Sequence, residues 1–333
     1  MAGRENRVTI NDVAKRAGVS KGTVDRVLHD RGEVSPKSRD KVLKVIEELG
    51  YKPNLYASIL ASQKVHRIVC VIPEYVSGDF WSLTAKGIDE AAEAASRFGV
   101  KVEIVTYDQY DVESFRDVCE GVLADLPSGV VVAPMFRAET LNFVKNLAAS
   151  DVPYVYIDSK LEDNGYSAYF GMPMFQSGYL CADIMADGRS LEKILVVRIE
   201  RDKMGYSDPT VARRTGFMEY MAAYCPGTHI VNVFIDPKNP ENVRQKLDEA
   251  FSCPSENMGV VMFNSRIHLV AEYIRERAVK GVRVVGFDAL DKNLDALRGG
   301  HVQVLIAQHS DRQAASAVNA LEALTPKASA SLT

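Results

Sequence analysis

The first thirty residues contain polar and basic side chains that could contact DNA. Ser20 can cap a helix whose apolar residues, Val24 and Val27, would face a small core. The other face of this helix is polar and basic, and such a face can donate hydrogen bonds to base edges and phosphates in a major groove. The residues expected to contact DNA here are Thr9, Ser20, Lys21, Gly22, Thr23, Arg26 and His29.

A second short helix is predicted directly before this one. Thr9 and Asp12 have the spacing of a capping box, and Gly18 can adopt the left-handed conformation that ends a helix sharply. Two helices joined by so tight a turn form a helix-turn-helix. An ordinary helical hairpin is the alternative, but caps, turn and apolar spacing together favour DNA binding. Arg26 is the best candidate for a bidentate contact to guanine.

A second set of polar residues follows apolar, strand-like segments further along the chain. Ligands of a parallel sheet bind beyond the carboxyl ends of its strands, so we expect these residues to meet in one site. Phe80 and Trp81, the latter being the only tryptophan, add aromatic faces. Such rings stack on the C–H face of a sugar, while carboxylates and amides bond its hydroxyls. The polar set comprises Asp108, Gln109, Asp158, Asn264, Asp288 and Gln308.

Each of these residues also has a plainer interpretation. Asp158 or Asn264 taken alone would more often cap a helix, because strand-to-helix loops commonly end in such a residue. Phe80 and Trp81 taken alone would more often belong to a core. Their joint placement at matching strand ends favours a ligand site over these separate roles.

The elements that position this site are of two alternating kinds. Short β-branched runs are separated by helical patterns such as Leu83–Phe98, Phe115–Leu126 and Leu269–Lys280. Strands that are apolar on both faces and alternate with helices predict an α/β fold, with parallel sheets flanked by helices in a two-lobed body. The predicted strands are Ile68–Ile72, Val100–Tyr107, Gly129–Ala133, Tyr154–Ile157, Lys193–Val197, Ile230–Phe234, Gly259–Phe263, Val282–Phe287 and Val302–Ile306.

Charge separates the start of the chain from the rest. Residues 1–67 carry 14 Lys and Arg against 8 Asp and Glu, while the remainder carries 26 against 36. A third helix, capped by Ser35 with Pro36 at its first position and ended by Gly50, completes a three-helix headpiece. A basic headpiece on an acidic body is typical of a DNA reader joined to an effector domain.

The headpiece resembles that of the LacI family of transcriptional repressors. From Asp12 the chain follows the pattern Asp-Val-Ala-x-x-Ala-Gly-Val-Ser-x-x-Thr-Val-x-Arg-Val-Leu, and the likeness continues through Pro53 and Asn54. The predicted recognition helix departs from the family at Gly22, where many members have a larger polar residue, and at Asp25, where Ser is common.

The resemblance implies a hinge and a ligand cleft. The segment after the headpiece would fold on DNA into a hinge helix, with Asn54 and Ala57 along it and Leu60 wedged into the central base step. The body would have the periplasmic-sugar-binding-protein fold, in which Arg213 matches a ligand-clamping arginine. The residues that would line the cleft are Phe80, Trp81, Asp158, Arg213, Asn264, Asp288 and Gln308.

We expect four parts along the chain. Residues 1–52 form the headpiece, 53–66 the hinge, 67–325 the effector domain and 326–333 a disordered tail. The effector domain would comprise a first lobe of about 67–158 plus 289–306, and a second lobe of about 160–288 plus 309–325. No leucine-rich tetramerising helix follows, so a homodimer is the expected assembly.

These features predict a ligand-responsive transcriptional regulator whose partners are a near-palindromic double-stranded DNA operator and a sugar or sugar derivative. A repressor of carbohydrate-use genes fits best. The alternatives are a cytosolic or exported sugar-binding protein without a DNA role, and an enzyme. An enzyme is disfavoured because no nucleophile–base spacing, phosphate loop or metal cluster is present, so we expect no catalytic residue, cofactor or metal.

Cysteine usage and the first residues predict the compartment. Five scattered cysteines, odd in number and without metal or redox spacing, predict buried, reduced thiols. We expect neither a signal peptide nor a membrane-spanning segment, and therefore a cytoplasmic protein without a membrane partner.

Overall fold

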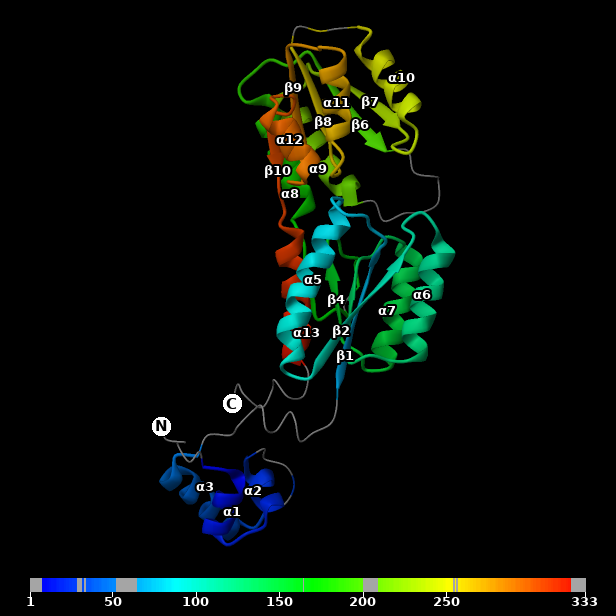
Figure 1. Ribbon diagram of the computed structural model, residues 1–333. Helices are drawn as coiled ribbons and strands as arrows, with labels where there is room; N and C mark the ends of the chain where they lie inside the picture. The colour runs from blue at the N-terminus through cyan, green and yellow to red at the C-terminus, as the bar shows by residue number, and fades with distance from the viewer. Residues whose placement is uncertain are drawn as a thin grey trace, which may run out of the picture. The chain divides into compact units, whose positions relative to one another are not determined.

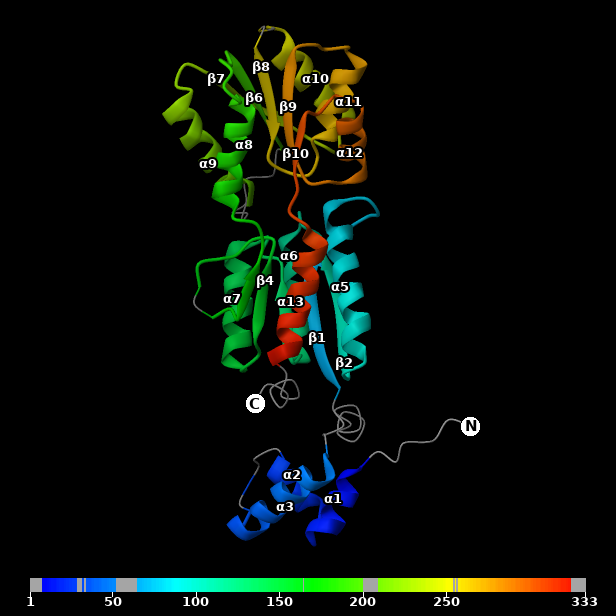
Figure 2. The same cartoon turned by 90° about the vertical axis from the view of Figure 1, so that its left-hand side faces the viewer.

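The computed structural model describes residues 8–28, 32, 34–51, 65–163, 165–199, 209–253, 255 and 257–324. The chain divides into a unit that contains the N-terminal helices and a unit spanning His66–Ala323. Each unit is described separately below and can be followed in Figures 1 and 2. Residues 53–64 of the predicted hinge and the whole predicted tail, 326–333, lie outside the described residues.

The N-terminal unit has three described helices, α1 (Ile10–Ala17), α2 (Lys21–Leu28) and α3 (Pro36–Leu49). The Thr9 backbone N–H donates to the Asp12 carboxylate at 2.8 Å, and Thr9 Oγ1 accepts from the Asp12 N–H, which confirms the capping box. Gly18 has a φ of 66°, so the predicted left-handed turn is also confirmed. The small core between the helices consists of Val13, Ala14, Ala17, Val24, Val27, Val42 and Val45.

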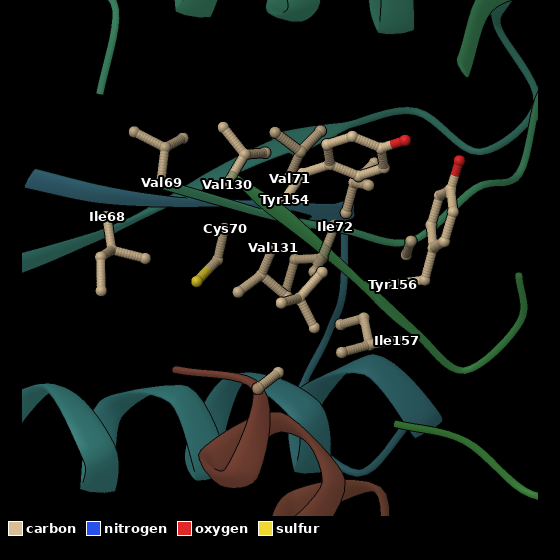
Figure 3. Packing of buried hydrophobic residues seen from close by; sticks show 14 of the residues in the cluster. Ile68, Val69, Cys70, Val71, Ile72, Val130, Val131, Tyr154, Tyr156 and Ile157 are labelled. Atoms are coloured by element: carbon tan, nitrogen blue, oxygen red, sulfur yellow. The ribbon is translucent and has the colours of Figure 1, made fainter. Parts of the chain in front are cut away.

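The first lobe of the body is built on a parallel sheet of order β2-β1-β3-β4-β5. Its helices are α5 (Phe80–Ser96), α6 (Val112–Ala124) and α7 (Arg137–Ala149), with α6 and α7 on the face opposite α5 (Figures 1 and 2). Ile68, Cys70 and Ile72 point to one side of β1 while Val69 and Val71 point to the other (Figure 3). The strands are β1 (His66–Pro73), β2 (Val100–Tyr107), β3 (Gly129–Val132), β4 (Tyr154–Ile157) and β5 (Ala168–Phe170).

The second lobe repeats this plan with a parallel sheet of order β10-β9-β8-β6-β7. Helices α8 (Met174–Ala186) and α9 (Pro209–Tyr224) cover one face, and three further helices cover the other (Figure 2). Those three are α10 (Pro240–Phe251), α11 (His268–Glu276) and α12 (Asp291–Arg298). The strands are β6 (Lys193–Ile199), β7 (His229–Ile235), β8 (Met258–Met262), β9 (Val282–Phe287) and β10 (Val304–Ile306).

The ends of the two lobes differ from the sequence-based assignment. Strand β10 pairs with β9 in the second lobe, whereas α13 (Ser310–Leu324) packs into the first-lobe core through Ala314, Val318 and Leu321. The predicted placement of 289–306 in the first lobe and 309–325 in the second is therefore wrong. Periodicity identified the strand and the helix, but it carries no information on which sheet a strand joins.

Two smaller expectations also need correction. Strand β5 was not predicted, because three residues are too few to show an alternating pattern. Of the cysteines, Cys70, Cys119 and Cys181 are buried as expected, but Cys225 is half-buried and Cys253 is exposed.

Candidate effector cleft and DNA-reading surface

The outer face of α2 is open to solvent. Lys21, Gly22 and Arg26 are exposed, as are Thr9 and Ser20 at the helix starts, while Thr23 is half-buried. Ser20 Oγ accepts a hydrogen bond from the Thr23 backbone N–H at 3.1 Å, so its role as helix cap is confirmed. Four other residues predicted to contact DNA, His29, Asn54, Ala57 and Leu60, lie outside the described residues.

Gly22 is exposed on this face of α2 and has no side chain. A Cβ added there would meet only Ser20 Oγ, at 3.7 Å, which is ordinary van der Waals contact. The helix geometry therefore does not require glycine at this position. Glycine instead leaves the exposed face of α2 without a side chain between Lys21 and Thr23.

All seven residues predicted to bind a ligand line one cleft of about 470 Å³ between the two lobes. Phe80, Trp81 and Asp158 come from the first lobe, Arg213, Asn264 and Asp288 from the second, and Gln308 from the connection between β10 and α13. Gln109 lines the cleft too, whereas Asp108 is absent from its lining. The carboxyl ends of strands from both sheets thus meet at one cavity, as the sequence predicted.

The aromatic pair is held by the start of α5. Asp79 caps this helix by accepting the Ser82 backbone N–H at 3.0 Å, which places Phe80 and Trp81 in the first helical turn. The two rings meet edge to face with centroids 5.0 Å apart. Trp81 is 7% exposed and packs in the first-lobe core, and it also lines the cleft. It is therefore a core residue as well as a candidate ligand contact.

Arg213 on α9 is buried and forms no ion pair among the described residues. Its guanidinium lies 4.4 Å from the centroid of the Phe287 ring, and Nη1 donates to the Phe263 carbonyl at 2.8 Å. The residue is 4% exposed, and Nε has no partner among the described residues. Burying an unsatisfied donor on a cation is costly, which makes Arg213 a candidate for binding a ligand oxygen.

Close packing of α8 against α9 positions this arginine. A Cβ on Gly178 would lie 1.7 Å from the Arg213 carbonyl oxygen, and one on Gly216 would lie 2.0 Å from that of Phe175. Only glycine permits two helices to approach so closely. The spacing of the two helices therefore depends on these glycines.

The two acidic residues at the strand ends have left-handed backbones. Asp158 and Asp288 have φ values of 63° and 67°, and for a residue with a Cβ such conformations concentrate at functional sites. Gln308 Nε2 donates to Asp288 Oδ1 at 2.9 Å, while Gln308 Oε1 has no partner among the described residues. Burial raises the pKa of Asp288 above its ordinary value, although nearby Arg213 opposes this shift.

Asn264 shapes its loop as well as the cleft. Its Oδ1 accepts the Arg266 backbone N–H at 3.0 Å, which closes a turn immediately before α11. The plainer interpretation of Asn264 as a residue that organises the start of a helix is thus partly correct. Its amide nitrogen has no hydrogen-bond partner among the described residues.

Comparison with known proteins identifies both parts of the chain. Residues 68–327 match the family described as periplasmic binding protein domain. The chain belongs to that family. Residues 9–54 match the bacterial regulatory proteins of the lacI family, so the domain is joined to a LacI-type headpiece.

Two named relatives are described as a transcriptional regulator and an operon repressor. The chain is 31% identical to the transcriptional regulator DegA of Bacillus subtilis over 45% of this chain and 44% of that protein. It therefore aligns with less than half the length of that relative. It is 24% identical to the ribose operon repressor of Lactococcus lactis over 84% of this chain and 80% of that protein. A Bacteroides fragilis structure, described as a candidate LacI transcriptional regulator, is 29% identical with a TM-score of 0.74 over 79% of this chain and 91% of that one.

Sequence reasoning missed a polar network in this periplasmic-binding-protein domain. Buried Asn293 donates through Nδ2 to the carbonyls of Ser265 and Phe287 at 2.9 and 3.1 Å, which fixes Oδ1 as an acceptor. His268 Nδ1 lies 3.1 Å from that Oδ1 and must carry the proton, so Nε2 is an acceptor in the neutral ring. Burial lowers the pKa of His268, which favours this neutral form.

Three residues missed by the sequence analysis lie at the second-lobe wall of the cleft: Arg266, His268 and Lys292. The signal that could have found Arg266 and His268 is their position just after strand β8, where ligand-binding loops of such sheets begin. Within the described part of the chain, no group of three potential metal ligands is present. No helix there is long and apolar enough to cross a bilayer.

Proposed function

We propose that this protein is a sugar-responsive, DNA-binding transcriptional regulator of the LacI type, acting as a homodimeric repressor of carbohydrate-use genes in the cytoplasm. The observation that carries the proposal is the joining of a LacI-type headpiece, with an exposed recognition helix, to a cleft lined by all seven predicted ligand residues. The proposal is supported by the named relatives, which include a transcriptional regulator and an operon repressor.

The DNA partner in this proposal is a near-palindromic operator. A homodimer presents two recognition helices, and each enters a major groove at one half-site. Arg26 reads a guanine, and the exposed residues around it contact neighbouring bases and phosphates. The segment 53–64, which includes Leu60, serves as the hinge helix in the minor groove.

The effector acts by changing the angle between the lobes. The chain passes from one lobe to the other at residues 171–173 and 307–309, so two short connections can bend together. Across the cleft rim, Lys238 of the second lobe lies 4.5 Å from the ring centroid of Tyr110 of the first. A ligand held between the lobes stabilises one arrangement of this rim, and the hinges transmit the change to the headpieces.

The test begins with DNA. Full-length protein is used to select binding sites from random-sequence duplexes, and the selected site is then titrated by fluorescence anisotropy with and without candidate sugars. The expected result is a near-palindromic site that some sugar releases or tightens. Sugar binding without any selected site would mean a sugar-binding protein, and turnover of a sugar would mean an enzyme.

A further inference from the structure

We propose that the effector carries a negatively charged group, a carboxylate or a phosphate, that binds beside Arg266 and Lys292 on the second-lobe wall of the cleft. This inference rests on the proposed function, because it specifies the chemical class of the effector. A neutral hexose would leave these charges without a counterpart.

The cations that line the cleft form no ion pair among the described residues, although Arg213 lies near Asp288. Arg213, Arg266 and Lys292 all line the cleft, and none of them belongs to an ion pair of the described residues. Arg213 is 96% removed from solvent with its Nε unsatisfied, and Arg266 is half-buried. A partly desolvated cation without a partner favours a ligand anion.

Three carboxylates of the cleft, those of Asp79, Asp158 and Asp288, already interact with other groups of the protein. Asp79 accepts backbone N–H groups of Val76 and Ser82, both at 3.0 Å, and Asp288 accepts from Gln308. Asp158 also has an interaction within the protein. Burial raises the pKa of Asp288, which further weakens its negative charge. The remaining acid, Asp291, is exposed at the start of α12. Apart from Asp291 and Lys292, which are both exposed, Arg266 is the charged residue of the cleft whose side chain has no hydrogen bond among the described residues.

Two helices begin next to these cations. Arg266 lies directly before α11, and Lys292 lies in the first turn of α12. The N-terminal ends of helices carry partial positive charge, which adds to the attraction for an anion. Two helix starts and two cationic side chains thus act on the same wall.

His268 distinguishes a sugar derivative from a simple anion. Its Nδ1–H is fixed by Asn293, so neutral Nε2 accepts a hydrogen bond. An acceptor suits a hydroxyl and repels an anionic oxygen. A ring with hydroxyls next to an acidic substituent, as in a uronic acid or a hexose phosphate, satisfies Arg266, Lys292 and His268 together.

The experiment uses Trp81 as a reporter, because the only tryptophan of the full-length protein lies in the cleft. Its fluorescence is titrated with glucose, galactose and mannose, each as the neutral sugar, the uronate and the 6-phosphate. At least one anionic form is expected to bind about tenfold or more tightly than its neutral parent. The uronate and phosphate arms show which acidic group is recognised.

Variants then test which cationic side chains bind the acidic group of the effector. Arg266→Gln is expected to reduce the preference for the anionic form by about tenfold or more, and Lys292→Gln to reduce it less, since Lys292 is exposed. Arg275→Gln is the matched control, because Arg275 is an exposed arginine in the last turn of α11 and does not line the cleft. It should leave the preference unchanged.

Three outcomes would overturn the inference: a neutral sugar that binds as tightly as its anionic forms, no response to any of the nine compounds, or an Arg266→Gln variant with full preference. Operator anisotropy measured on the same samples separates this failure from failure of the proposed function. A neutral sugar that controls operator binding would contradict the inference of an anionic effector but would support the proposed function as a transcriptional regulator.

Discussion

The recognition helix and the effector cleft expose their functional residues to opposite degrees. In the headpiece, Lys21, Gly22 and Arg26 lie on the surface and contribute nothing to the core. In the cleft, Trp81 and Arg213 are almost completely buried, and each also packs inside its own lobe, Trp81 in the first-lobe core and Arg213 against Phe287 of the second lobe. In the proposed regulator, DNA preference can therefore change by single surface substitutions. Substitutions that change ligand preference should also change the stability of the fold.

This difference makes the two regions separable by experiment. A substitution on the recognition helix should move DNA affinity and leave thermal stability alone. A substitution in the cleft should move ligand affinity and stability together, because the same atoms serve both. Four predictions test this separation, beginning with the largest effect.

The largest effect is expected for Arg213→Met. Methionine keeps an apolar stem against Phe287 but removes every N–H that a ligand could use. Loss of two charge-assisted hydrogen bonds, each about 1.5–3 kcal/mol, should weaken effector binding by about 100-fold or more. Trp81 fluorescence measures the affinity. Near-normal effector binding would mean that Arg213 is only a packing residue.

Gly178→Ala tests the packing that places Arg213. The new Cβ would lie 1.7 Å from the Arg213 carbonyl, so α8 and α9 must separate. We expect a loss of about 1–3 kcal/mol in stability and a weaker response to effector. The matched control is Gly121→Ala in α6, where the added methyl meets nothing within 4 Å. This control should gain about 0.5–1 kcal/mol. Equal behaviour of the two variants in thermal denaturation would contradict the close-packing argument.

Arg26→Ala tests the exposed side of the comparison. Loss of a bidentate contact to guanine should cost about 1–3 kcal/mol at the selected operator and relax the preference at one base pair. The melting temperature should not change, since Arg26 is exposed. Affinity for random DNA is the control. An unchanged base preference would show that another residue reads this position.

The smallest effect is expected for Asp288→Asn and depends on pH. Burial raises the pKa of Asp288, so above that pKa folding must desolvate a charge that asparagine lacks. The variant should melt at a higher temperature than wild type at pH 7. The gain should shrink as pH falls through the raised pKa and vanish below the ordinary value, where both states of the wild type are protonated. A gain that is independent of pH would mean that charge burial is not its cause.

Local patterns predicted much of the fold, because short-range chemistry determines them. The capping box at Thr9, the turn at Gly18 and nine strands of the two sheets followed from spacing and β-branched runs. The assignment of β10 and α13 to lobes failed, since that depends on long-range packing. The cleft residues at strand ends could be anticipated because parallel sheets place ligands there. The Asn293–His268 network could not, because it joins the first turns of α11 and α12, which are 25 residues apart in the sequence.

The central claim is that cleft occupancy and operator binding are coupled in one chain. The most direct test is a titration of full-length protein with effector, with Trp81 fluorescence and operator anisotropy read from the same sample. By linkage, the factor by which effector changes operator affinity must equal the factor by which operator changes effector affinity. The account predicts two equal factors of about fivefold or more. A cleft that fills with no change in operator affinity would contradict it.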